Sequence, residues 1–132
     1  VHSDGNDMDI INNQGALEAL HRLKQEGLIR AYGMSTKTVE GGTWIVEHTD
    51  VVMATYNLET DVELPVIERA HELNKGVVVK KGLQSGHAAS VEDAFRLVLS
   101  QPGVSSMIVG TINADHLRSN VDACNRVINN MV

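Results

Sequence analysis

Four short apolar runs, separated by stretches of helical periodicity, dominate the pattern of hydrophobic and polar positions. The runs cover residues 29–35, 50–56, 76–81 and 105–109. Near-continuous apolar runs of this length are typical of parallel strands that are covered on both faces. Their starts lie roughly 20 to 30 residues apart, which is the spacing of strand–helix units. The pattern predicts an α/β fold whose parallel sheet contains about four βα units.

The segments between these runs carry helix start and stop signals. Gly27 can end the first helix in a left-handed cap, and Pro65 suits the first turn of a second. Ser90 with Asp93 resembles a capping box at the start of a third helix. The last helix is predicted to carry an apolar stripe made of Leu117, Val121, Cys124, Ile128 and Met131.

Two segments fit this scheme poorly. Residues 39–48 contain the pair Gly41–Gly42, which disfavours a helix. Residues 4–9 are predicted to form an acidic, polar loop, and calcium binding there lacks the carboxylate spacing of an EF-hand.

The most informative stretch covers residues 106–120. It predicts a buried strand, a short Gly110–Thr111 turn, and a helix that opens on the cap residue Asn113. The free N–H groups and the positive dipole end of such a helix favour a bound anion. Because this unit closes a series of strand–helix units, it suggests a nucleotide-phosphate site on a parallel α/β fold.

Composition narrows the possible functions. The 132 residues suffice for one domain with a real core, and 42% hydrophobic with 21% charged residues is ordinary for a globular protein. A net charge of −6 argues against a nucleic-acid or membrane-surface role, since both need basic patches. Aromatic residues make up only 3% of the chain, which disfavours a base-stacking platform.

Cysteine and histidine usage gives further limits. Cys124 is the single cysteine, which excludes an internal disulfide and fits a reducing compartment. No apolar run approaches the ~20 residues that span a bilayer, and no signal-peptide pattern is present, so we expect a cytoplasmic protein. His21, His48 and His71 have no ligand spacing, and we predict no metal site.

The chain is short for the barrel that its units suggest. A closed (β/α)8 barrel of the TIM type needs about 250 residues, roughly twice the length of this chain. Residues 1–4 look like the end of a strand, so we expect residues 1–132 to be a single domain truncated at its N-terminus. A natural four-unit domain is the alternative. A half barrel leaves strand edges unpaired, and we therefore expect a homo-oligomer or association with the missing N-terminal half.

Five motifs, in order, resemble the C-terminal half of the aldo-keto reductases. His2-Ser3-Asp4 is similar to the end of the family's fourth strand, and residues 27–35 (GLIRAYGMS) resemble its "GKIRAIGVSN" run. Tyr56-Asn57-Leu58 resembles "EYNLL" after the sixth strand, and residues 80–86 occupy the place of the seventh-strand loop. Residues 110–120 match "GTSNPEHLEEN", which wraps the cofactor's adenosine phosphate. The resemblance implies the C-terminal half of a (β/α)8 barrel and carbonyl reduction with NADPH.

The resemblance also implies roles for single residues. His2 would orient the substrate carbonyl, and Ser35 would bind the nicotinamide carboxamide beside Thr36, where the family usually has Asn. Lys80 stands where an aromatic residue often stacks on the nicotinamide ring. It would contact the pyrophosphate, lie along the ring by its alkyl stem, or simply be a solvated strand end. Asn57 either has a site role or caps the strand end structurally.

The remaining matches lie in the last two loops. Cofactor contacts would come from Gly82, Leu83, Gly110, Thr111, Asn113, His116 and Asn120. Gly110 stands where many members carry a phosphate-binding Lys, and His116 stands where many carry Arg. Because a 2′-phosphate favours Arg or Lys, the preference between NADP(H) and NAD stays open.

The implied function is reduction of aldehydes or ketones by an NADP-dependent oxidoreductase. The family's catalytic Asp, Tyr and Lys belong to earlier strands, and Tyr32 and Tyr56 lie in the wrong strands to replace the general acid. We therefore expect no turnover from this chain alone. Two alternatives are a Schiff-base lyase of the class I aldolase type, using Lys80 or Lys81, and a non-catalytic dinucleotide-binding module.

Overall fold

A four-stranded parallel sheet forms the centre of the computed structural model, which describes residues 1–131. The strands are β1 (Gly33–Ser35), β2 (Val51–Thr55), β3 (Gly76–Lys80) and β4 (Val104–Met107), and they lie in the order β1-β2-β3-β4. The predicted parallel α/β fold is confirmed. β1 is shorter than predicted because the Tyr32 N–H donates to the Asp50 carboxylate, 3.1 Å away, instead of to a neighbouring strand.

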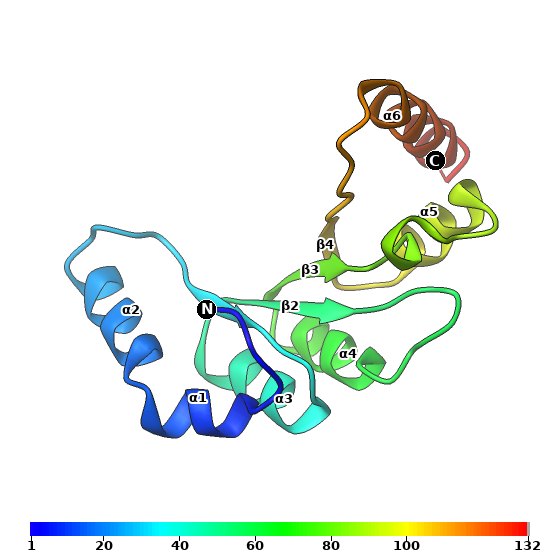
Figure 1. Ribbon diagram of the computed structural model, residues 1–132. Coiled ribbons are helices and arrows are strands. Elements are labelled where there is room, and N and C mark those ends of the chain that lie inside the picture. Colours follow the sequence, from blue (N-terminus) through cyan, green and yellow to red (C-terminus); the bar gives the residue numbers. More distant parts are fainter. Residues whose placement is uncertain (132) are drawn as a thin grey trace.

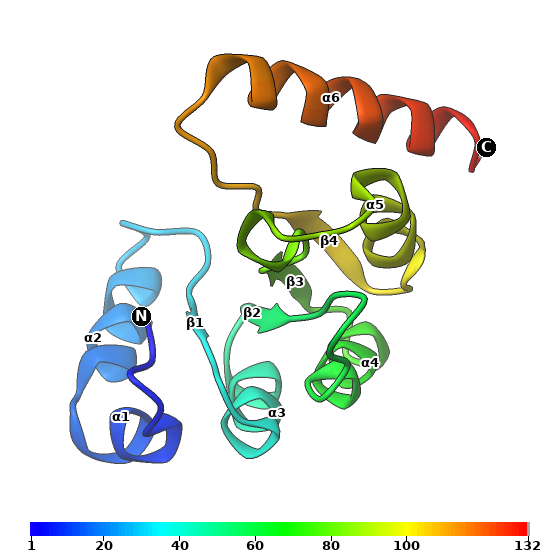
Figure 2. The ribbon, with the colours of Figure 1, turned by 45° about the vertical axis from the view of Figure 1, so that its right-hand side comes forward.

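Helices follow or precede each strand. They are α1 (Asp7–Asn13), α2 (Ala16–Gln25), α3 (Val39–His48), α4 (Leu64–Glu72), α5 (Val91–Ser100) and α6 (Ala114–Asn129), with a short 3-10 turn, η1 (Gln84–Gly86). Figures 1 and 2 show α3, α4 and α5 along one side of the sheet, and α6 beside α5. None of the helices within residues 1–131 is long and apolar enough to cross a membrane.

The two faces of the sheet are buried to different degrees. Val52 and Ala54 of β2 and Val77 and Val79 of β3 are fully buried under the helices. Their alternate neighbours on the opposite face are only half-buried: Val51, Met53, Thr55, Val78 and Lys80. Since side chains alternate between faces along a strand, the helices cover one face and leave the other partly open.

The predicted helix signals match the structure. Gly27 follows α2 with a φ of 75°, Pro65 lies in the first turn of α4, and Ser90 Oγ accepts a hydrogen bond from Asp93 N. α6 differs from expectation. Its predicted stripe is largely exposed, with Leu117 and Val121 both at 50%, and α6 packs through Ala123 and Val127 instead.

The predictions for two segments were incomplete or wrong. α3 forms despite Gly41 and Gly42, because the Thr38 hydroxyl caps its first turn and because both glycines are buried against neighbours. A Cβ at Gly41 would lie 2.3 Å from the Cβ of Asp7. Residues 4–9 are not all loop, since α1 begins at Asp7, whose carboxylate is buried under the start of α3.

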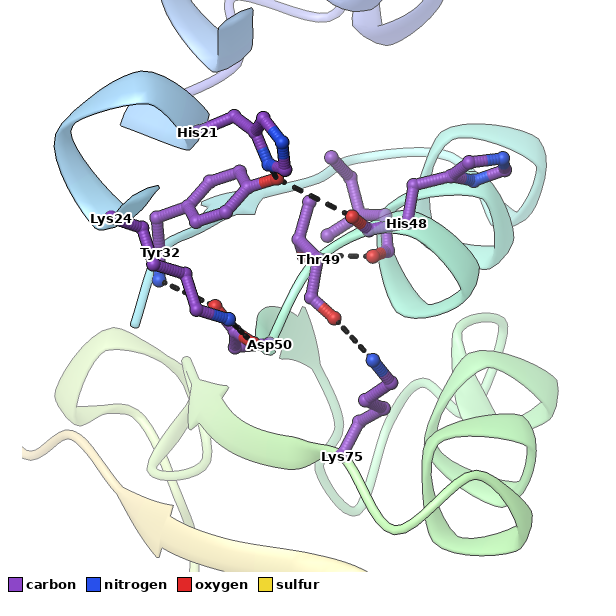
Figure 3. A network of polar contacts seen from close by, with 8 residues as sticks. His21, Lys24, Tyr32, His48, Thr49, Asp50 and Lys75 are labelled. Carbon is purple, nitrogen blue, oxygen red and sulfur yellow. Dashed lines mark hydrogen bonds and ion pairs between the residues drawn. The ribbon is translucent and has the colours of Figure 1, made fainter. Parts of the chain in front are cut away.

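Polar side chains join the elements at the amino ends of the strands (Figure 3). Asp50 accepts from Lys24 Nζ at 2.5 Å and from Tyr32 N at 3.1 Å. Lys75 Nζ donates to the Thr49 carbonyl at 2.7 Å, and the Tyr32 hydroxyl lies 3.1 Å from His21 Nδ1. This network fixes α2 and the segment before β1 against the start of β2.

Candidate functional site

The carboxyl ends of all four strands meet at one edge of the sheet, because the strands are parallel. In barrels of this kind the active site lies at that edge. The predicted site residues follow these strand ends, and the structure divides most of them into two groups. One group is a cluster of side chains at the ends of β1 and β3, and the other lines a cleft between the loops after β3 and β4.

The strand-end cluster consists of Ser35, Thr36, Glu63 and Lys80. Lys80 Nζ donates to Ser35 Oγ at 2.9 Å and also to the Thr36 carbonyl oxygen. Glu63 is only 4% exposed, and its carboxylate accepts from Thr36 Oγ1 at 3.1 Å and from Thr55 N at 2.8 Å. The cluster therefore ties the ends of β1, β2 and β3 together.

Sequence reasoning missed Glu63. It lies at the start of α4, just before Pro65, where an acidic side chain normally interacts favourably with the helix dipole. Nothing in the local sequence distinguishes that role from a buried acceptor. Only its low exposure and its two partners reveal its place in the cluster.

Lys80 is not a solvated strand end. Its side chain is half-buried, and this burial lowers the pKa of the ammonium below its usual value. The carboxylate of Glu63 acts in the opposite direction, and the charge of Lys81 adds to the lowering. The cluster thus contains a partly buried amine held by two oxygen acceptors.

The cleft has a volume of about 650 Å3 and lies between the β3–α5 and β4–α6 loops. Its apolar lining comes from Leu83, Ala88, Val91, Ile108 and Val109. Its polar lining comes from Lys81, Ser85, Thr111, His116, Ser119 and Asn120, with the backbone of Gly86 and Gly110. An apolar floor with a few polar groups is typical of sites for small molecules and cofactors.

Five of the predicted cofactor-binding residues line this cleft: Leu83, Gly110, Thr111, His116 and Asn120. Lys81, Ser85 and Ser119 also line it and were not among the predicted cofactor contacts. A positional signal exists for Ser119, which lies three residues after His116 and therefore on the same face of α6.

Two other predicted site residues, Asn113 and Gly82, have structural contacts, and so does Asn57, for which a structural role was left open. The Asn113 carboxamide oxygen accepts from Asp115 N at 2.8 Å and from His116 N at 3.3 Å, so it caps α6 as predicted. Gly82 is buried where a Cβ would meet Met107 Cε at 2.2 Å. Asn57 caps the end of β2, because its side chain accepts from Glu59 N at 2.9 Å and donates to the Lys81 carbonyl at 3.0 Å.

His2 lies beside Ser35. Residues 1–3 pair in parallel with β1: Ser35 N donates to the Val1 carbonyl at 2.9 Å, and Ser3 N donates to the Ser35 carbonyl at 3.0 Å. Directly paired residues share a face of a sheet, so exposed His2 is on the face that carries Ser35. The predicted catalytic histidine is therefore adjacent to the strand-end cluster.

Within residues 1–131, no three His, Cys, Asp or Glu side chains are arranged to hold a metal ion. Cys124 is partly buried and packs against the small core between α5 and α6.

Comparison with known proteins gives matches to solved structures only. No family model and no curated protein sequence matches the chain. Two structures of aldo-keto reductase homologues from Pseudomonas aeruginosa match 97% of the chain at a TM-score of 0.88, with 51% and 49% identity. An aldo-keto reductase from Bacillus halodurans, in its holo form, matches 93% of the chain at 21% identity and a TM-score of 0.78, which shows the shared fold.

The chain spans about half the length of these relatives, since it covers 50%, 49% and 53% of them. Its four parallel strands and flanking helices match the C-terminal half of their barrel. The resemblance drawn from the five sequence motifs is thereby confirmed. In sequence and in fold, the chain belongs with the aldo-keto reductases and corresponds to the C-terminal half of their (β/α)8 barrel.

Proposed function

We propose that this chain is the dinucleotide-binding half of an NADP-dependent carbonyl reductase. The observation that carries the proposal is the cleft of about 650 Å3, whose apolar floor and polar rim lie at the carboxyl edge of the sheet. A bound dinucleotide would supply the hydride for reduction of an aldehyde or ketone.

The residues of the cleft fit the adenosine end of such a cofactor. Lys81, Thr111 and His116 offer a cation, a hydroxyl and an imidazole to phosphate oxygens, and Asn120 offers an amide to the base. The apolar floor beneath them would exclude water from the adenine ring. The strand-end cluster fits the nicotinamide end through the Ser35 hydroxyl, which accepts from Lys80 Nζ. Thr36 would act there only by positioning, because its side chain is fully buried and its hydroxyl donates to Glu63.

Thermal unfolding with and without cofactor tests this binding. A ligand that binds only the folded state at a hundredfold excess over its Kd adds about 2.7 kcal/mol to stability. We expect NADPH to raise the unfolding midpoint, and NAD to raise it less. A cooperative transition that does not respond to NADPH contradicts the proposal.

A matched pair of variants locates the site. Lys81→Met removes a cation that lines the cleft, whereas Arg30→Met removes a cation from an exposed loop outside the cleft. Both lower the net charge by one. We expect Lys81→Met alone to reduce the NADPH-induced shift, and an equal loss in both variants would point to nonspecific attraction.

We further propose that the chain alone does not turn over. Reduction needs a general acid within hydrogen-bond reach of the carbonyl oxygen. The Tyr32 hydroxyl is engaged with His21 and the His48 carbonyl at the amino end of the sheet. Tyr56 is buried beside a separate small cavity. NADPH-dependent reduction of an aldehyde by the purified chain would overturn this expectation.

The partner that completes the site is proposed to be an N-terminal half barrel. β4 pairs only with β3, and residues 1–3 pair only with β1, within the described part of the chain. α6 also exposes apolar side chains such as Leu117 and Val121. Mixing the chain with the N-terminal half of a related reductase should give a one-to-one complex in light scattering. The assignment is wrong if the chain stays a stable monomer in the presence of this half, or if it forms a dimer with itself instead.

A further inference from the structure

Lys80 differs from the other lysines of the chain in its surroundings. It ends β3, opposite Thr55 in the register of the sheet, and it lies on the partly open face, away from buried Val77 and Val79. Its Nζ reaches across β2 to Ser35 Oγ at 2.9 Å and to the Thr36 carbonyl. The amine is therefore held at the carboxyl edge of the sheet.

Both oxygen partners of Lys80 are uncharged. No carboxylate lies within 4.0 Å of Lys80 Nζ among residues 1–131, whereas Lys24 forms an ion pair with Asp50 at 2.5 Å. A hydroxyl and a carbonyl orient an ammonium group without holding its proton as a carboxylate does. The two carboxylate oxygens of nearby Glu63 instead accept hydrogen bonds from Thr36 Oγ1 and Thr55 N.

Burial also favours the neutral form of the Lys80 amine. It lowers the pKa of Lys80, and the positive charges of Lys81 and Lys37 add to that effect, although the carboxylates of Glu63 and Asp7 oppose it. A lower pKa raises the fraction of neutral amine at a given pH. Lysines activated in this way are the ones that attack carbonyl groups.

We propose that Lys80 is a nucleophilic amine that condenses with small aldehydes at the carboxyl edge of the sheet. The neutral Nζ attacks the carbonyl carbon, a C–N bond forms, and a proton passes from nitrogen to oxygen to give a carbinolamine. Loss of water then gives the imine. The reaction needs neither a hydride nor a bound dinucleotide, so it can be assayed on the chain without cofactor.

The test is reductive trapping on the full chain without any cofactor. The protein is incubated with propionaldehyde and cyanoborohydride, which reduces an imine to a stable secondary amine, and peptide mapping follows the alkylation rate at each lysine. Exposed Lys37 and ion-paired Lys24 serve as internal references. At about pH 6 we expect Lys80 to be alkylated several-fold faster than exposed Lys37, because burial lowers the pKa of Lys80 and raises its neutral fraction.

A pH series separates activation from mere accessibility. At about pH 11, where unperturbed lysines are also largely neutral, exposure decides, and Lys37 should react at least as fast as Lys80. If Lys80 is no faster than Lys37 at the lower pH, or if the ratio is the same at both, the proposal is wrong. Because the measurement uses the wild-type chain, misfolding of a Lys80→Arg variant cannot obscure the result. Failure of NADPH to bind would leave the alkylation pattern intact, so the two proposals fail separately.

Discussion

The hydrogen bonds of Asp7 allow a quantitative test of what holds the segment between Thr36 and α3 in place. Its side chain is only 2% exposed, and one carboxylate oxygen, Oδ2, accepts three hydrogen bonds. The donors are Lys37 N at 2.9 Å, Thr38 N at 2.8 Å and Thr38 Oγ1 at 2.7 Å. These bonds join the start of α1 to the segment between Thr36 and α3, and Thr36 itself belongs to the strand-end cluster.

The magnitude follows from these bonds. A hydrogen bond to a charged group contributes about 1.5–3 kcal/mol, and such contributions do not add fully. Lys37 and Thr38 are otherwise exposed, so water can satisfy part of what Asp7→Ala removes. We expect Asp7→Ala to lower the free energy of unfolding by about 3 kcal/mol. Asp7→Asn keeps one acceptor oxygen and should cost about half as much.

The pH dependence gives an independent check. Burial opposes the charged form of Asp7, but the nearby Ser3 hydroxyl and the hydrogen bonds from Thr38 and Lys37 N outweigh it and lower the pKa below the usual 3.8. A carboxylate with a lowered folded-state pKa contributes stability above the unfolded-state pKa and loses it as the pH falls through the folded-state value. The difference between wild type and Asp7→Asn should therefore shrink as the pH drops below about 4.

Urea unfolding across this pH range measures both effects. Asp9→Asn is the matched control, because Asp9 lies in the same helix and carries the same charge but is exposed. We expect its effect to be much smaller than that of Asp7→Asn. The reasoning is refuted if both Asp7 variants stay within about 0.5 kcal/mol of wild type, the range of ordinary surface substitutions. If the stability difference between wild type and Asp7→Asn grows as the pH falls, the inferred lowering of the Asp7 pKa is wrong.

Three further substitutions test other contacts. Gly41→Ala gains about 1 kcal/mol of helix propensity, but its new Cβ would lie 2.3 Å from Asp7 Cβ. We therefore expect urea unfolding to show a net loss of about 1–3 kcal/mol in the free energy of unfolding. A net gain would contradict this packing. Asp50→Asn should cost about 1–2 kcal/mol at neutral pH. Burial works against its charged form, yet bonds from Lys24 and Tyr32 N lower the Asp50 pKa, so this loss should diminish below about pH 4. Asn113→Ala should cost about 1 kcal/mol, read as faster amide hydrogen exchange in α6, while Asn113→Asp keeps the cap and should not.

Local sequence rules predicted the parts of the fold that depend on local chemistry. Strand positions followed from apolar runs, and the Gly27, Ser90 and Asn113 caps followed from side chains that satisfy nearby backbone groups. The exceptions arise from tertiary contacts. Gly41 and Gly42 disfavour a helix in isolation, but α3 needs them because larger residues would overlap Asp7 and Val66.

α6 shows a second kind of limit. The larger apolar residues of its sequence formed a periodic stripe, yet that stripe is half-exposed at Leu117 and Val121. The face that packs on α5 uses Ala123 and Val127. A helical period identifies faces but does not say which one meets the next helix, and small side chains allow the closer approach.

The candidate site shows why sequence alone gave its positions but not its geometry. Ser35 and Lys80 are 45 residues apart, and they meet because the register aligns Ser35 with Met53 and Thr55 with Lys80. That alignment is a property of the whole sheet. The family motifs located both residues, but neither the hydrogen bond between them nor the buried acid Glu63 follows from any local pattern.

The charged side chains at the two ends of the sheet differ in their partners. At the amino ends, Asp50, Lys24 and Tyr32 satisfy one another and close the structure. At the carboxyl ends, Lys80 is bound only by neutral oxygens, and an open cleft lies alongside. Changes in the first set should alter the free energy of unfolding and leave ligand-induced shifts unchanged. Changes at Lys81 should do the reverse, because an exposed cation in a cleft adds little to folding and much to the capture of an anion.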